Sequence, residues 1–270
     1  MNTGSAFYIG KTHKICEDYA SHKMHPQPYI LLSDGCSSSP NTDFGSRILN
    51  QVAGDMLSLD QEFDPKEFIN EAEEIRRLLN LPSGSLDATL SCVYVKDERY
   101  YLHMFGDGVT VKTKEDKSME VVLIEYLSGA PNYLSYNLDP IRKKGYFDLY
   151  GLKKKISTYL LEPNGIVTGF VIKEDSEDTF YTENGSCIGY RNISLMSDGV
   201  LSFYQLLNSG TSKTEEMIPL NNVLLQLLDF KGFQGEFVDR RLQKFRKDCE
   251  KINWFHADDL SLATIYFGKD

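Results

Sequence analysis

The order of the elements along the chain predicts an α+β fold in four layers. Strands come first, followed by two helices, more strands, two further helices and a final strand. Leu90–Val95 and Tyr100–Phe105, joined by a polar turn, are typical of a hairpin and therefore of antiparallel sheet. Helices that come in pairs pack as layers outside the sheets. We therefore expect an α-β-β-α sandwich, with two central antiparallel sheets flanked by helix pairs. A doubly wound parallel fold is disfavoured because strand–helix alternation is missing.

Apolar and β-branched runs locate the other strands. These predicted strands are Tyr29–Leu32, Ile193–Met196, Leu260–Phe267, Lys155–Leu161 and Ile166–Lys173.

Apolar side chains spaced by about four residues locate the helices. In the first helix we expect Asp43 to be the N-cap, and Asp64-Pro65 is a start signal for the second. The predicted helices are Asp43–Leu57, Pro65–Leu79, Asn222–Phe230 and Glu236–Ile252, the last of them basic and amphipathic.

Size and charge limit the possible functions. The 270 residues contain no Pro/Gly/Ser-rich linker and no repeat, which favours a single domain over 1–270. A net charge of −10 disfavours nucleic acid and anionic membranes as partners.

Five widely spaced cysteines form neither a disulfide framework nor a zinc signature. The N-terminus has no apolar signal-peptide core, so we expect a cytoplasmic protein.

Acidic residues follow several apolar strands. Asp34-Gly35, Asp107-Gly108 and Asp198-Gly199 each end such a run, Asp258 precedes the last strand, and Glu17-Asp18 lies near the N-terminus. A carboxylate at a strand end lies where the rigid sheet meets solvent, and a following glycine allows a sharp turn. Oxygen-only ligands select Mg²⁺ or Mn²⁺. One Asp-Gly alone is more often a turn, so the prediction depends on the joint arrangement.

These motifs resemble those of the metal-dependent protein phosphatase 2C family, in a single-domain, bacterial-like variant. Gly10-Lys11-x-His13-x-x-x-Glu17-Asp18, the strand ending at Asp34-Gly35 and Asp43-x-Gly45-Ser46 resemble the family's first motifs. Gly106-Asp107, Ser197-Asp198-Gly199 and Asp258-Asp259-Leu260-Ser261 resemble the later ones, in family order.

The resemblance implies a serine/threonine protein phosphatase that hydrolyses phosphoserine or phosphothreonine with a metal-activated water. Asp34 would bridge two Mg²⁺ or Mn²⁺ ions, and the Gly35 carbonyl would contact one of them. Asp198 and Asp258 would complete the other ion's shell. Glu17 and Asp18 would bind directly or through water, and Asp107 with Asp198 would hold a weaker third ion. The partner would be a phosphorylated protein, phosphorylated by an opposing serine/threonine kinase, and the enzyme a monomer.

Several positions depart from the family pattern. His13 occupies the position where many members carry an arginine that grips phosphate, and it is our candidate substrate-binding residue, with Lys11 or Lys14 as substitutes. The usual Asp-Asn is replaced by Asp258-Asp259. These changes leave open the alternative of a weak or inactive pseudophosphatase acting as a regulatory binding module. Ser128–Tyr150, rich in tyrosine, is either a lid or substrate surface, or a plain loop.

Overall fold

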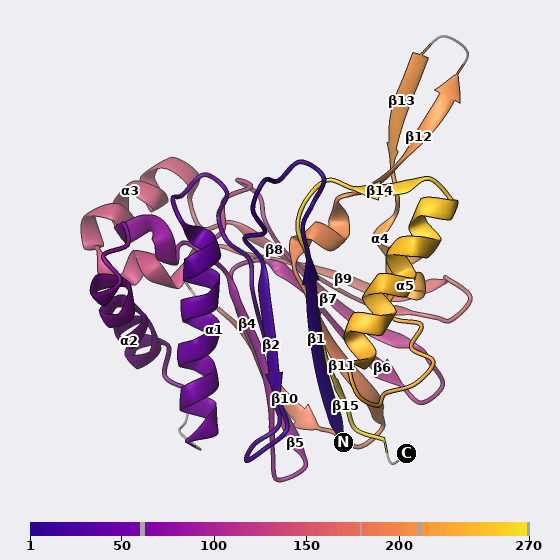
Figure 1. The fold of residues 1–270 in the computed structure, drawn as a ribbon, viewed down its shortest axis with the longest axis horizontal. Helices are drawn as coiled ribbons and strands as arrows, with labels where there is room; N and C mark the ends of the chain where they lie inside the picture. The colour runs from indigo at the N-terminus through magenta and orange to yellow at the C-terminus, as the bar shows by residue number, and fades with distance from the viewer. Residues whose placement is uncertain (60–62, 179, 210–211, 269–270) are drawn as a thin grey trace.

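Two antiparallel sheets pack face to face between two groups of helices, as Figure 1 shows. This computed structural model describes residues 1–59, 63–178, 180–209 and 212–268. The predicted four-layer sandwich is confirmed.

The smaller sheet of the described chain has the strand order β10-β5-β4-β3-β2 and the larger one β1-β15-β11-β6-β7-β8-β9. Neighbouring strands pair antiparallel throughout both sheets. The smaller sheet consists of β2 (Tyr19–Lys23), β3 (Tyr29–Ser33), β4 (Leu90–Lys96), β5 (Arg99–Phe105) and β10 (Tyr181–Ser186). The larger consists of β1 (Asn2–Tyr8), β6 (Gly108–Lys114), β7 (Met119–Tyr126), β8 (Lys154–Leu161), β9 (Val167–Asp175), β11 (Tyr190–Met196) and β15 (Leu260–Tyr266).

Side chains of the two inner faces form the central core. Ile30, Leu32 and Val93 of the smaller sheet pack against a cluster that includes Ile193 and Ile265 of the larger one. The outer faces are also apolar because helices cover them. This explains why β3 is buried along its whole length and reads as a continuous apolar run rather than an alternating one.

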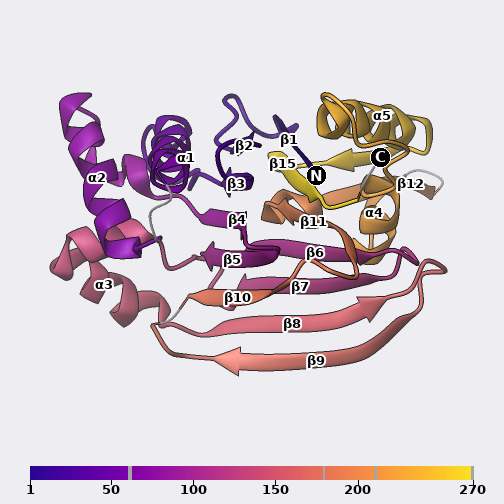
Figure 2. The same cartoon turned by 90° about the horizontal axis from the view of Figure 1, so that it is seen from below.

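Helices cover each outer face. On the smaller sheet lie α1 (Thr42–Ser58) and α2 (Pro65–Leu78), and on the larger sheet α4 (Leu220–Leu227) and α5 (Phe237–Lys251), as Figure 2 shows. The predicted cap of the second helix is confirmed, since Asp64 accepts the Lys66 N–H at 2.7 Å. The predicted N-cap of the first helix is wrong. Asn41 holds that position with a left-handed φ of 58° and makes no side-chain cap.

The sequence analysis did not predict the sheet strands β1, β2, β6, β7 and β10, and it also missed several elements outside the two sheets. A helix, α3 (Pro140–Tyr150), lies on the α1/α2 side after the short helix η2 (Leu134–Leu138). A hairpin of β12 (Phe203–Ser209) and β13 (Ser212–Met217) projects from the body beside β14 (Trp254–His256). Two further short helices are η1 (Ser83–Leu86) and η3 (Asp198–Leu201).

Other expectations concern cysteines and membranes. All five cysteines lie in the described part of the chain and each one is free. None of the described helices combines the length and the apolar character needed to cross a membrane.

Candidate metal and substrate site

Four of the predicted carboxylates line one pocket of about 220 Å³ at an end of the sandwich. Asp34 follows β3 and Asp107 follows β5, so both come from the smaller sheet. Asp198 opens η3 directly after β11, and Asp258 precedes β15, so these two come from the larger sheet. The pocket therefore lies where strand ends of both sheets meet, and residues more than 200 positions apart share it.

Local backbone contacts fix Asp34. Its N–H donates to Thr89 Oγ1 at 3.0 Å, and its carbonyl accepts the Thr89 N–H at 2.8 Å. Gly35, which also lines the pocket, has no room for a side chain, because a Cβ there would lie 2.9 Å from the Thr42 Cβ and 3.0 Å from the Glu17 Cβ. The glycine is thus required by the close approach of both the start of α1 and the N-terminal loop.

Asp107 is held by two glycines. Gly106 has a φ of 109° and Gly108 a φ of 133°, a region that other residues rarely enter. This tight turn between β5 and β6 directs the Asp107 side chain into the pocket.

Burial and mutual repulsion raise the pKa values of the clustered carboxyl groups. Burial and the charge of Asp198 raise the pKa of Asp107 to about 8. Burial, together with neighbouring carboxylates, also raises the pKa values of Asp34 and Asp258. Such a cluster favours the binding of positive charge, either protons or a divalent cation.

Glu17 and Asp18 lie outside the lining of this pocket. Asp18 is fully buried, and its Oδ2 accepts a hydrogen bond from Ser197 Oγ at 2.7 Å. Its Oδ1 makes no hydrogen bond of good geometry within the described residues, although the Ser261 side chain interacts with the carboxylate. Burial raises the pKa of Asp18 to about 7. The Glu17 carboxylate accepts the Thr42 hydroxyl at 2.6 Å. Glu17 and Asp18 therefore contact residues next to the pocket, Thr42 and Ser197, without lining it themselves.

The donor set fits hard divalent cations. No three His, Cys, Asp or Glu side chains in the described ranges are arranged to hold an ion by themselves. Mg²⁺ usually keeps several water ligands and binds only one or two carboxylates, so three side chains already arranged around one point are not required. The four oxygen-donor side chains in one pocket match this chemistry.

His13 lies in the pocket between two carboxylates. Its Nε2 is 3.2 Å from Asp258 Oδ1, and its Nδ1 is 3.1 Å from Asp259 Oδ1. Burial alone would lower the pKa of His13, but the interactions with Asp259 and the charges of Asp258 and Glu17 together outweigh burial and raise the pKa. Lys11 and Lys14 do not line the pocket, and Lys11 Nζ instead lies 3.5 Å from the centre of the Phe255 ring.

Asp259 is a candidate positioning residue, although the sequence analysis named it only as a departure from the family pattern. It is 2% exposed and accepts the N–H groups of Gly10 at 2.7 Å and Glu17 at 2.6 Å. It thereby ties both ends of the N-terminal loop to the start of β15. The available sequence signal was that His13 and Asp259 both depart from the family pattern.

The Ser128–Tyr150 segment is ordered by its own contacts and is not a plain loop. Asp87, buried beneath it, accepts the Ser135 hydroxyl at 2.7 Å and pairs with Arg142 of α3. The rings of Tyr136 and Tyr146 pack at 4.8 Å between centroids. Gly129, Pro131 and Tyr133 line the carboxylate pocket, so this segment forms one of its walls.

The fold and the carboxylate pocket define an α-β-β-α protein with a candidate metal centre. Residues 10–133 match the family model described as protein phosphatase 2C, a span that includes Glu17, Asp34 and Asp107. The predicted resemblance is confirmed: the chain is protein phosphatase 2C-like in its N-terminal half by sequence and throughout by fold.

Solved structures match over the full length. A bacterial serine phosphatase has a TM-score of 0.56 at 10% identity, with 100% of this chain and 99% of the other covered. Serine/threonine phosphatase Stp1 from Staphylococcus aureus has a TM-score of 0.56 at 12% identity, with 100% and 96% covered. The Mycobacterium tuberculosis serine/threonine phosphatase PstP/Ppp has a TM-score of 0.52 at 11% identity, with 99% and 98% covered. At these identities the matches establish the fold. No curated protein matches the chain.

Proposed function

We propose that this protein is a metal-dependent serine/threonine protein phosphatase, acting on phosphoserine and phosphothreonine in protein substrates. The observation that carries the proposal is the convergence of Asp34, Asp107, Asp198 and Asp258, from the ends of four strands, on one pocket. The family match over residues 10–133 supports the same reaction.

In this proposal Asp34, Gly35, Asp198 and Asp258 would hold two Mg²⁺ or Mn²⁺ ions, and Asp107 would contribute to a weaker third site. When bound, such ions offset the negative charge of the phosphoryl oxygens and lower the pKa of a bound water molecule. Asp18 would act from outside the pocket lining, where Ser197 donates a hydrogen bond to one of its oxygens. Glu17, fixed by Thr42, acts beside it.

His13 is the proposed phosphate-binding group. As an imidazolium it would place positive charge at the pocket wall, as the arginine of other family members does. The carboxylates of Asp258 and Asp259 favour its protonated form and lie 3.2 and 3.1 Å from its two ring nitrogens. Because a carboxylate lies beside each ring nitrogen, His13 would act on phosphate mainly through its charge. That interaction is weaker than the bidentate hydrogen bonding of an arginine.

The remaining expectations belong to the same proposal. The chain acts as one domain over 1–270, as a cytoplasmic monomer, and opposes a serine/threonine kinase. It uses neither nucleic acid nor a membrane as partner. Sedimentation velocity tests the monomer directly.

The test is hydrolysis of p-nitrophenyl phosphate and a phosphothreonine peptide with Mn²⁺, with Mg²⁺ and with EDTA. We expect metal-dependent phosphate release that Asp198→Ala lowers by at least about 100-fold. Asp55→Ala is the matched control, because Asp55 is exposed on α1 and its carboxylate accepts hydrogen bonds from Gln51, away from the pocket. Thermal unfolding with and without Mn²⁺ shows whether each variant is folded and binds metal.

The second candidate is a pseudophosphatase that serves as a regulatory binding module. The observation that favours it is the ion-paired His13 in place of a free arginine. Stabilisation by Mn²⁺ without turnover of either substrate would select this candidate. Turnover abolished by Asp198→Ala would exclude it.

A further inference from the structure

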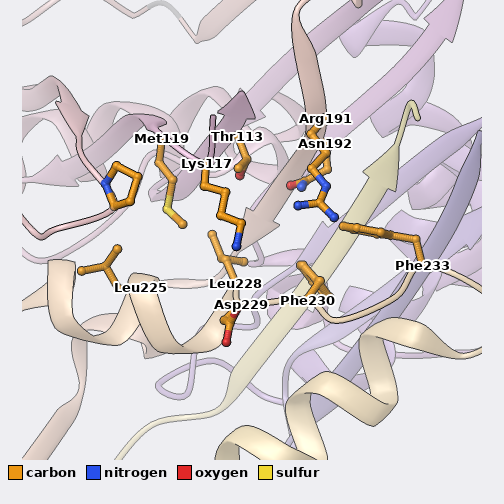
Figure 3. A pocket seen from close by; sticks show the side chains of 11 residues that line it. Thr113, Lys117, Met119, Arg191, Asn192, Leu225, Leu228, Asp229, Phe230 and Phe233 are labelled. Atoms are coloured by element: carbon orange, nitrogen blue, oxygen red, sulfur yellow. The ribbon is translucent and has the colours of Figure 1, made fainter. Parts of the chain in front are cut away.

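A second pocket, of about 290 Å³, lies between the larger sheet and α4 (Figure 3). Thr113 lies near the end of β6, the strand that begins after Asp107, and Arg191 lies near the start of β11, the strand that leads to Asp198. A seven-residue strand spans roughly 20 Å. The second pocket is therefore at the opposite end of the strands that carry the candidate metal ligands.

Three adjacent strands form the floor of this pocket. Thr113 pairs directly with Met119 of β7 on one side and with Asn192 of β11 on the other. Directly paired residues point to the same face of a sheet, and here that face is the one covered by α4. Leu225 of α4 and Phe230 in the loop after it form the apolar wall.

The floor contains an unused hydrogen-bonding group. Thr113 is only 5% exposed, and its Oγ1 has no partner among the described residues. Buried hydroxyl groups nearly always have a partner in native proteins, and each exception calls for an explanation. A ligand atom in the pocket would supply the missing partner.

Two cationic side chains enter the same space. Lys117 comes from the β6–β7 turn and Arg191 from β11, and Figure 3 shows Thr113 between them. Neither forms an ion pair within the described ranges, although the Arg191 guanidinium lies 5.0 Å from the centre of the Phe233 ring. Asp229, the acidic group of the lining, is 2.6 Å from Lys231. The balance of unpaired charge is therefore positive.

We propose that this pocket binds a small organic monoanion, a carboxylate carried on an acyl or aromatic body. The carboxylate would interact with Lys117 and Arg191 and accept a hydrogen bond from Thr113 Oγ1. The apolar body would lie along Met119, Leu225 and Phe230. The volume is at the lower end of the range of small-molecule sites, which suits a compact ligand. The site is separate from the carboxylate pocket, so its occupation does not depend on the phosphatase reaction.

Isothermal titration calorimetry with octanoate tests the proposal, with octanamide as the uncharged counterpart. The full chain is titrated in EDTA, so that the carboxylate cannot bind through a metal ion. We expect octanoate to bind at least about tenfold more tightly than octanamide, the scale of one charge-assisted contact. No octanoate binding at millimolar concentration, or equal binding of octanamide, overturns the proposal.

Single substitutions test whether octanoate binds in this pocket. Arg191→Gln and Lys117→Gln should each weaken octanoate binding by roughly fivefold or more. The matched control is Lys114→Gln, which removes a charge from the same hairpin, where Lys114 pairs with Glu120 at 2.9 Å outside the pocket. Binding that responds equally to all three substitutions would reflect general charge and contradict the site.

Thr113→Val separates a ligand contact from a packing defect. Valine has the shape of threonine and lacks the hydroxyl, so the melting temperature should be unchanged or higher. Octanoate binding should fall nevertheless. Unchanged octanoate affinity in this folded variant would remove the assigned role of the hydroxyl and count against the pocket.

Discussion

His13 and Asp259 are in contact, and both depart from the family pattern that the sequence resembles. An arginine is charged at any relevant pH, whereas a histidine is charged only when protonated. Asp259 lies 3.1 Å from His13 Nδ1 and favours the protonated ring. Local sequence patterns could not reveal this contact, because the partners of Asp259 lie more than 240 positions away along the chain. Asp34, Asp107 and Asp198 were predictable because each carries a local signal, an apolar run followed by Asp, and Asp258 because it precedes the apolar run of β15.

The first prediction concerns His13 and rests on the proposed reaction. His13→Ala should raise KM for the phosphothreonine peptide by about tenfold with a smaller change in kcat, because a binding contact is lost from substrate and transition state alike. His13→Arg should restore KM, most clearly at about pH 8, where arginine remains charged. Lys14→Ala is the control, since Lys14 is exposed and outside the pocket. A larger KM effect from Lys14→Ala would move the phosphate-binding role to that residue.

The second prediction concerns Asp259. Asp259→Asn, although it restores the family's usual residue, should lower the free energy of unfolding by about 1–3 kcal/mol. Both carboxylate oxygens accept backbone N–H groups, at 2.7 and 2.6 Å, and an amide would turn an NH₂ donor toward one of them. Urea unfolding followed through Trp254 fluorescence measures the change. Asp55→Asn should stay within about 0.5 kcal/mol of wild type, and an equal effect of both substitutions would refute the role of Asp259.

At the scale of single elements, α3 shows why periodicity can miss a helix. Its local start signal, Asp139-Pro140, is the same as the Asp64-Pro65 signal that located α2. Asp139 accepts the N–H groups of Ile141 at 2.9 Å and Arg142 at 3.1 Å. However, α3 buries only Tyr146 among its residues, so it has no apolar stripe. Helices that bury an apolar face, such as α2, were predictable from the spacing of their apolar residues. The helix α3, which is held by its N-cap and by the ion pair of Arg142 with Asp87, was not.

The third prediction compares the two caps. Asp64→Ala should lower the global free energy of unfolding by about 1 kcal/mol, because α2 buries Phe68, Ile69 and Ala72 in the core. Asp139→Ala should leave the global value nearly unchanged and instead speed hydrogen exchange at the α3 amides. Urea unfolding and amide exchange measure the two effects. Equal global destabilisation by both substitutions would show that α3 unfolds together with the core.

For the whole molecule, the four layers were predictable from the sequence. Which strand ends would meet to form the carboxylate pocket was not. Apolar runs and helix pairs specify four layers because each element must bury its apolar face. Which strand ends meet depends on long-range pairing, such as that of β1 with β15 across the full length of the chain. The projecting β12–β13 hairpin packs on little of the body, so no core pattern marks it in the sequence.

The meeting of strand ends concentrates negative charge at one end of the sandwich, which leads to the last prediction. The raised pKa values of Asp18 and Asp107, about 7 and 8, mean that ionising these groups costs more in the folded than in the unfolded chain. Stability of the metal-free protein is therefore highest when they are protonated and should fall as the pH rises from about 5 to 8. The raised pKa of His13 acts in the same direction.

Divalent cations and one substitution should each reverse this loss. Saturating Mn²⁺ should raise the melting temperature at about pH 8 more than at about pH 5, because protons and the cation compete for the same oxygens. Asp107→Asn should stabilise the metal-free protein at the higher pH by at least about 1.4 kcal/mol, the equivalent of one pKa unit, and should flatten its pH dependence. Asp55→Asn should follow wild type at both pH values. A metal-free protein that is equally stable at both pH values, or one that Asp107→Asn weakens, would mean that the strand-end carboxylates do not repel one another, and the argument for a cation between them would lose its electrostatic basis.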